Sequence, residues 1–93
     1  MSRKQVLAVD YGASGGRVML GGFDGTSFTI SELHRFSNDP VILGDTMYWD
    51  VLRLFFEMKQ GIIKSKTHGA ISGIGVDTWG VDFGLLDRKE NLL

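Results

Sequence analysis

The pattern of apolar and polar residues predicts three short strands at the start of the chain. The first, Val6–Val9, is apolar at four consecutive positions, as is typical of a strand covered on both faces. Two further strands are predicted at Arg17–Phe23 and Phe28–Phe36, separated by the turn residues 24–27. Short connections of this kind predict an antiparallel meander with the first strand in a central position.

A surface loop and then a helix are expected after the meander. Residues 37–48 include Pro40 and Gly44 and lack periodicity, which predicts a loop. Asp50 is a suitable N-cap for the helix that follows. The apolar residues at helical spacing, predicted to be core, are Val51, Leu52, Leu54, Phe55, Phe56, Met58, Ile62 and Ile63. The polar residues expected on a narrow opposite arc are Arg53, Glu57, Gln60 and Lys64.

Two more strands are predicted in the last third of the chain, at Ala70–Val76 and Val81–Leu86. A strand reached through a helix normally returns parallel to a neighbour, and the first strand is the expected neighbour. Gly73 and Gly75 share one face of the fourth strand, which favours close packing there. The expected fold is therefore α/β, with a mixed five-stranded sheet, an antiparallel meander plus a parallel strand, and a crossover helix.

Composition narrows the class of protein. Ten basic and eleven acidic residues give a net charge of −1. The chain therefore has no excess of positive charge that would indicate binding to nucleic acid or to an anionic membrane. The 93 residues include no cysteine, which excludes disulfides and is compatible with the cytoplasm, the expected location. The first apolar run is too short for a signal peptide or membrane span. Leu92 and Leu93 begin another apolar run, so the chain is expected to be a fragment.

Candidate chemistry begins at the end of the first strand. Asp10 precedes a turn that contains Gly12, Gly15 and Gly16, and glycines allow backbone N–H groups to approach a ligand closely. Ser14 adds a hydroxyl donor. Such a turn suits a phosphate, with the carboxylate nearby for its metal ion. An extended run follows instead of a helix, which excludes Walker and dinucleotide loops; a plain hairpin turn remains the alternative.

A second group of polar and aromatic residues follows the fourth strand. If that strand is parallel to the first, Asp77 and Asp10 lie at the same sheet edge, where open sheets bind ligands. Asp77 equally suits a structural hydrogen-bond network. Trp79, Gly80 and Asp82 combine a flat ring, an accessible backbone and a carboxylate, which are groups that hold sugars. The alternative for Trp79 is a place in the core.

Two segments, Ala8–Leu20 and Ile74–Phe83, closely resemble the N-terminus of the FGGY carbohydrate kinases, and within them the enzymes that phosphorylate L-rhamnulose. Leu33–Phe36 and Trp49–Val51, which lie between these two segments, resemble the same enzymes at the corresponding positions. The similarity covers essentially all 93 residues. The first segment alone would mark only the wider actin-like ATPase and sugar-kinase superfamily.

The resemblance implies an actin-like ATPase fold of RNase H-like type, with residues 1–93 as the N-terminal part of domain I. It implies transfer of the γ-phosphoryl group of ATP to the 1-hydroxyl of L-rhamnulose. Asp10 then corresponds to the acid that holds Mg²⁺, through water, and Gly80 to a sugar contact with Trp79 and Asp82 as neighbours. The implied phosphate-binding residues are Gly12, Ala13, Ser14, Gly15, Gly16 and Arg17. Gly15 stands where the family often has serine, which removes one hydroxyl donor.

The catalytic base of the family lies in the later half of a much longer chain, so we expect the 93 residues alone to be inactive. Two other functions remain open at this point. The first is a related kinase for another substrate, such as L-fuculose, xylulose or glycerol. The second is a non-catalytic ATP-binding module of the actin-like superfamily. Sugar and ATP are the expected partners in the kinase interpretations, and the sequence predicts no oligomeric state.

Overall fold

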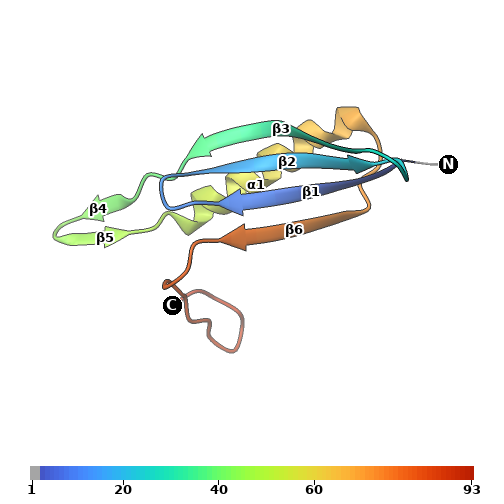
Figure 1. Ribbon diagram of the computed structural model, residues 1–93. Coiled ribbons are helices and arrows are strands. Elements are labelled where there is room, and N and C mark those ends of the chain that lie inside the picture. The colour runs from blue at the N-terminus through green and yellow to red at the C-terminus, as the bar shows by residue number, and fades with distance from the viewer. Residues whose placement is uncertain (1–2) are drawn as a thin grey trace.

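The computed structural model describes residues 3–93, which form a four-stranded mixed sheet with one helix against it (Figure 1). The sheet order is β3-β2-β1-β6. The strands and helices, in chain order, are β1 Lys4–Tyr11, β2 Gly15–Phe23, β3 Phe28–Ser37, β4 Val41–Leu43, β5 Thr46–Tyr48, α1 Val51–Ser65, the short 3₁₀ turn Lys66–His68 and β6 Gly73–Thr78.

The meander and the crossover are confirmed. β1, β2 and β3 pair antiparallel, with a bulge in the β2 and β3 pairing at Val18 and Met19. The reversal between β2 and β3 is held by Asp24, whose Oδ1 accepts hydrogen bonds from the amides of Thr26 (2.9 Å) and Ser27 (2.7 Å). β6 returns parallel to β1, as the crossover rule predicts.

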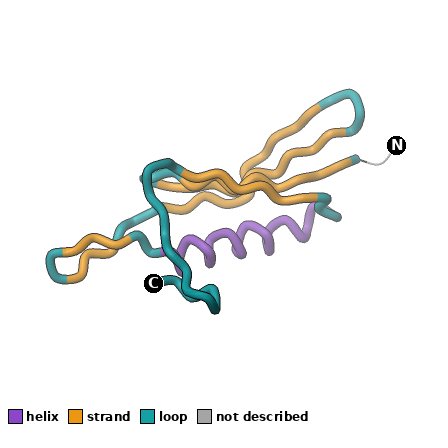
Figure 2. The backbone as a smooth tube through the Cα atoms, turned by 90° about the horizontal axis from the view of Figure 1, so that it is seen from below, coloured by secondary structure: helices purple, strands orange, loops and turns teal. Residues whose placement is uncertain are grey.

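The core lies between the sheet and α1, which covers one face only (Figure 2). Alternate residues of a strand point to opposite faces, so the buried side chains of β1 and β2 all lie on the helix side. These are Leu7, Val9, Val18 and Leu20, and the half-buried residues packed against them include Leu33, Met58, Ile62 and Ile71. The first strand is therefore buried on one face rather than two, because Val6 on the other face is 43% exposed.

The helix starts where predicted, and Met58 and Ile62 pack against the core as predicted, but the side of the helix that faces the sheet is shifted from the predicted apolar face. Asp50 caps it, since its Oδ1 accepts a hydrogen bond from the Arg53 amide at 3.1 Å. The buried residues of α1 are Glu57, Gly61 and Ser65. The prediction that Glu57 lies on the polar arc opposite the core is therefore wrong. Several residues predicted to be core are instead more than two-fifths exposed, namely Val51, Leu52, Phe55, Phe56 and Ile63.

Gly61 allows the helix to approach the sheet closely on this side. A Cβ atom at this position would lie 2.6 Å from the Cβ of Val18, so the helix backbone approaches the sheet more closely than a side chain would allow. Glu57 and Ser65 lie one turn to either side of this contact. Their polar atoms are satisfied, because Ser65 Oγ donates to the Ile62 carbonyl at 2.6 Å and Glu57 is paired with His34 and Arg53.

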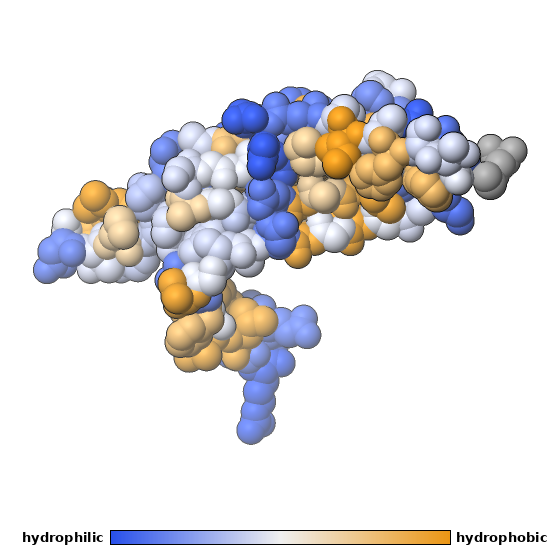
Figure 3. Space-filling view, viewed as in Figure 1, coloured by the Kyte–Doolittle hydropathy of each residue, from blue (hydrophilic) through white to orange (hydrophobic). Residues whose placement is uncertain are grey.

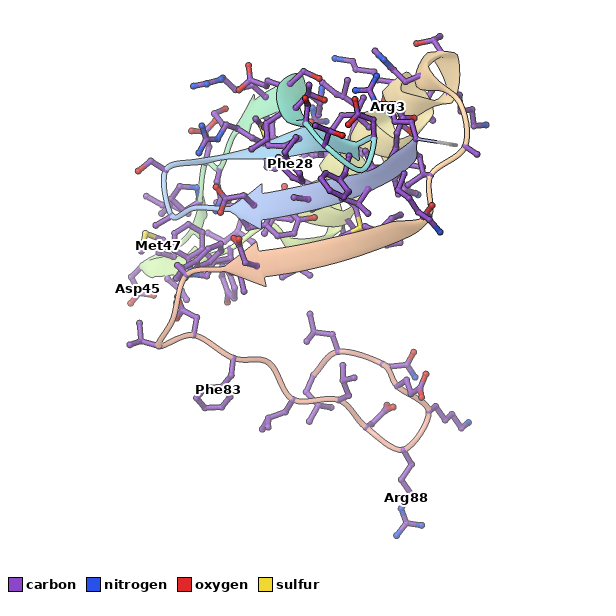
Figure 4. The ribbon with its side chains drawn as sticks, turned by 45° about the vertical axis from the view of Figure 1, so that its right-hand side comes forward. Arg3, Phe28, Asp45, Met47, Phe83 and Arg88 are labelled. Carbon is purple, nitrogen blue, oxygen red and sulfur yellow. The ribbon has the colours of Figure 1, made fainter. Side chains whose placement is uncertain are left out.

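The surface loop predicted for residues 37–48 is wrong in part, because β4 and β5 form a hairpin there. Val41 pairs with Tyr48 and Leu43 with Thr46. Gly44 occupies the connection with a φ of +64°, a conformation that suits glycine. The hairpin projects beyond the end of the four-stranded sheet, and Figure 4 shows Asp45 and Met47 at its far end. Its pattern was missed because each strand has only three residues.

The predicted fifth strand, Val81–Leu86, is also wrong, since the sheet of the described residues has four strands. Val81 adopts a φ of +70°, which interrupts an extended chain. Beyond it the chain leads away from the sheet, as Phe83 and Arg88 show in Figure 4. A single antiparallel bridge joins Leu86 to Leu92 around a turn in which Asp87 accepts hydrogen bonds from two backbone amides.

The sheet face opposite α1 is open and partly apolar (Figure 3). Phe28 is 62% and Ile30 is 64% exposed. A Cβ atom at Gly73 or Gly75 would have no neighbour within 4 Å, so the close packing predicted at these glycines does not occur within residues 3–93. No helix among these residues is long and apolar enough to cross a membrane.

Candidate functional site

Asp10 and Asp77 are register partners on the adjacent parallel strands β1 and β6. Both lie near the carboxyl ends of their strands, and by alternation both lie on the face opposite the helix. The hydrogen bond between the two carboxyl groups lowers the pKa of Asp10 and raises the pKa of Asp77 from the ordinary value of 3.8. The strand pairing thus brings together two acids that the sequence placed at one sheet edge.

Arg17 completes this charged group from the neighbouring strand. It is the register partner of Asp10 on β2, and its Nη2 lies 3.4 Å from Asp10 Oδ2. The guanidinium contributes further to the lowered pKa of Asp10. Because both side chains are more than two-fifths exposed, this ion pair is accessible and is weak as a source of stability. The Arg17 guanidinium is therefore accessible to an anionic ligand.

The glycine turn between β1 and β2 is closed by a hydrogen bond from the Gly12 amide to the Gly15 carbonyl at 2.9 Å. A Cβ atom at Gly12 would lie 2.7 Å from that same carbonyl oxygen, and one at Gly16 would lie 2.9 Å from the Asp10 carbonyl oxygen. Both positions therefore require glycine for steric reasons. The two residues at the tip, Ala13 and Ser14, are exposed, so the turn presents its backbone to solvent.

A depression of about 640 Å³ lies beside this turn. It is lined by Asp10, Gly12, Ser14, Gly15, Gly16, Arg17, Arg35, Phe36 and Ser37. All the predicted phosphate-binding residues except Ala13 are in this lining. Arg35, the register partner of Arg17 on β3, was missed by sequence reasoning. The signal available was the antiparallel meander itself, which places a residue near the end of β3 beside the start of β2.

Trp79 and Asp82 meet at a second depression, of about 320 Å³, together with Trp49. The rings of Trp49 and Trp79 are 4.8 Å apart between centroids. Asp82 Oδ2 accepts hydrogen bonds from both indole nitrogens, at 3.1 Å from Trp49 and 2.6 Å from Trp79. Gly80, the third predicted residue, is exposed and does not line this depression.

Trp49 had no predicted role. It directly precedes α1, and a crossover helix starts at the end of the sheet at which the following parallel strand finishes. This topology therefore places the segment before the helix and the segment after β6 at the same end of the sheet. The periodicity of the sequence contains no such information, because the two segments are far apart in the chain.

The described residues fit a magnesium ion only as part of a larger ligand set. Within residues 3–93 no three His, Cys, Asp or Glu side chains gather into a metal site. Mg²⁺, however, is usually held by one or two carboxylates, several waters and the phosphates of its substrate. Asp10 and Asp77 beside the glycine turn meet the protein part of that requirement.

Comparison with curated proteins relates the chain to carbohydrate kinases. The relatives are rhamnulokinases: that of Bacteroides thetaiotaomicron is 39% identical over 92 residues, 98% of this chain and 19% of the relative. Those of Klebsiella pneumoniae (strain 342) and Pectobacterium atrosepticum are 42% and 43% identical over 96% of this chain, and 19% and 18% of the relatives. No family model matches the chain.

The resemblance predicted from the two motifs is therefore confirmed, since it extends along nearly the whole chain at 39–43% identity. The chain spans about one fifth of the length of these relatives.

Proposed function

We propose that these residues are the N-terminal part of domain I of an ATP-dependent kinase that phosphorylates L-rhamnulose at its 1-hydroxyl. The observation that carries this proposal is the pairing of Asp10 with Asp77 across β1 and β6. That pairing brings the glycine turn after β1 and the Trp79–Asp82 segment after β6 to the same end of the sheet. Open sheets bind ligands at the carboxyl ends of parallel strands.

Different residues would bind the two substrates, ATP and the sugar. The glycine turn, residues 12–17, would bind the phosphates of ATP through its backbone and the guanidinium of Arg17, and Arg35 would add a second positive charge. Asp10 would hold Mg²⁺ through water, and the ion would neutralise charge on the phosphates. The strand order and the crossover helix support an RNase H-like arrangement of this part.

The sugar would lie against the second depression. Trp79 and Trp49 supply flat apolar surfaces, on which the less polar face of a sugar packs. Asp82 already accepts two indole hydrogen bonds, so it would orient the rings as well as offer its second oxygen to a sugar hydroxyl. Gly80 would contribute backbone groups, since its exposed position leaves them accessible.

The test uses Asp10→Asn in the full-length protein. We expect ATP-dependent phosphorylation of L-rhamnulose by the unchanged protein. In the variant, the Mg²⁺ concentration that gives half of the maximal rate should rise roughly 10- to 100-fold, the usual effect of losing an outer partner of a metal ion. The measurement is the initial rate as a function of Mg²⁺ concentration. Asp45→Asn, at the hairpin tip, removes the same charge away from both depressions and is the matched control.

Two outcomes would contradict the proposal in different ways. A clear preference for L-fuculose, xylulose or glycerol in a substrate panel would replace the sugar and retain the kinase. Nucleotide binding without transfer to any sugar would favour the non-catalytic module. We assign no catalytic base within these residues, so the isolated chain is expected to show no transfer, and measurable phosphorylation by the 93 residues alone would contradict that expectation.

A further inference from the structure

Asn38 lies beneath the glycine turn and is only 4% exposed. Its side-chain Nδ2 donates a hydrogen bond to the Gly12 carbonyl at 3.0 Å. Its backbone amide donates to the Ser14 carbonyl at 3.1 Å. A single residue just after β3 therefore holds two carbonyl groups of the turn between β1 and β2.

These bonds limit which carbonyl groups of the turn are free to face a ligand. The third carbonyl, that of Gly15, accepts from the Gly12 amide. Three turn carbonyls are thus occupied within the protein, and carbonyl oxygens held inward do not repel an incoming anion. A turn that binds phosphate needs its N–H groups, not its carbonyls, toward the ligand. The two bonds of Asn38 favour that orientation.

We propose that Asn38 is a positioning residue that holds the glycine turn in the conformation that binds the phosphates of ATP. The inference rests on the proposed function of the turn. Asn38 does not line the depression beside the turn, so it would act through Gly12 and Ser14 rather than by touching the nucleotide. Its effect would be preorganisation: without it the turn must be ordered when ATP binds, which weakens binding.

The expected consequence is specific to one substrate. The depression that contains Trp79 and Asp82 shares no lining residue with the one beside the turn. Removing the Asn38 side chain should therefore raise KM for ATP and leave KM for the sugar unchanged. A general loosening of the fold would instead change both constants together or lower the amount of active protein.

The experiment compares Asn38→Ala and Asn38→Asp with the unchanged full-length protein. Asn38→Ala removes the donor to Gly12 and should raise KM for ATP by about 3- to 10-fold, the effect of losing one hydrogen bond. Asn38→Asp keeps the size of the side chain but places a carboxylate oxygen against the Gly12 carbonyl, so its KM for ATP should rise further. Asn91→Ala removes the other asparagine, which hydrogen-bonds Asp87, and is the matched control.

The proposal is overturned if Asn38→Ala leaves KM for ATP within twofold of the unchanged protein, or raises both KM values in proportion. If Asn38→Ala is recovered unfolded, Asn38→Asp decides, because it preserves the packing volume. Failure of both variants to fold would assign Asn38 a purely structural role and also overturns the proposal. These results differ from failure of the proposed function, in which the unchanged protein shows no transfer or Asp10→Asn has no effect.

Discussion

Trp49 and Trp79 pack ring to ring with 4.8 Å between their centroids, and Asp82 accepts a hydrogen bond from each indole. The contact joins the residue before α1 to the residue after β6. It converts two half-buried rings into one apolar surface with a carboxylate at its edge. This surface is a tertiary feature, because neither segment has it alone.

Under the proposed function, replacing Trp49 by alanine should weaken sugar binding. The loss of an aromatic partner leaves Trp79 less constrained, and we expect KM for L-rhamnulose to rise about 2- to 10-fold with KM for ATP unchanged. Trp49→Phe, which keeps a ring but lacks the N–H donor to Asp82, should have a smaller effect. Initial-rate kinetics of the full-length protein measure both constants.

Tyr48→Ala serves as the control for this prediction, because Tyr48 is the neighbouring aromatic residue and does not line the depression with Trp79. An unchanged KM for the sugar in Trp49→Ala would show that Trp49 does not contribute to the proposed sugar-binding surface. An equal rise in both KM values would point to a general disturbance of the fold instead.

The carboxyl pair Asp10 and Asp77 should give stability a distinct pH dependence. The folded-state pKa of Asp77 is raised, because Asp10 hydrogen-bonds and repels it. Its contribution to stability is therefore complete below the unfolded value of about 3.8 and is lost as the pH rises through the folded pKa. Asp10 has a lowered pKa, so its contribution is present above that value and is lost as the pH falls.

Asp77→Asn should remove the part of this dependence that belongs to Asp77. The amide can donate to the Asp10 carboxylate at every pH and carries no charge, so the urea midpoint should rise at neutral pH and vary less above pH 3.8. Denaturation curves measured without Mg²⁺ at several pH values test this. A midpoint that falls at neutral pH, or a pH profile equal to that of the unchanged protein, would contradict the assigned coupling.

Gly61→Ala should destabilise the fold through the contact between α1 and β2. Alanine improves helix propensity at an exposed site, but here its Cβ would lie 2.6 Å from the Cβ of the fully buried Val18. We expect a loss of about 1–3 kcal/mol in the free energy of unfolding, the usual cost of overpacking. Urea denaturation gives this value.

Gly73→Ala is the matched control for Gly61→Ala, because a Cβ at Gly73 meets no atom within 4 Å among the described residues. Its unfolding free energy should change little. If both alanine variants were equally stable, the close approach of helix and sheet at Gly61 would be refuted.

Glu57→Ala should cost about 1–3 kcal/mol of unfolding free energy, because it leaves a buried polar group without its partner. Glu57 is 5% exposed, and its two oxygens bind His34 Nε2 at 2.5 Å and Arg53 at 2.8 Å. Lys64 Nζ lies 2.8 Å from His34 Nδ1. Since lysine only donates, Nδ1 accepts and Nε2–H donates to Glu57.

Thermal or urea unfolding of Glu57→Ala, compared with Lys59→Ala on the exposed side of the same helix, measures this contribution. Lys59 lies over the exposed ring of Phe55, and the loss of this exposed cation–π contact should cost little stability. Equal stability of the two variants would show that the buried network contributes no more than a surface contact.

Local patterns predicted most of the sheet. The apolar run before Asp10, the turn residues 24–27 and the N-cap Asp50 each act within a few residues, and the described structure contains the strands, turn and helix that they indicate. The crossover rule added a parallel β6 and with it the meeting of Asp10 and Asp77. Resemblance to carbohydrate kinases added the roles proposed for these residues.

The amino-acid sequence by itself determined the meander, the helix, the parallel return strand and the sharp glycine turn, because these follow from backbone sterics and short-range periodicity. Tertiary structure alone decided that Glu57 is buried and that Trp49 meets Trp79. It also decided that Asn38 holds the turn at Gly12. Each of these depends on a contact between segments distant in the chain, whose energy no local pattern contains.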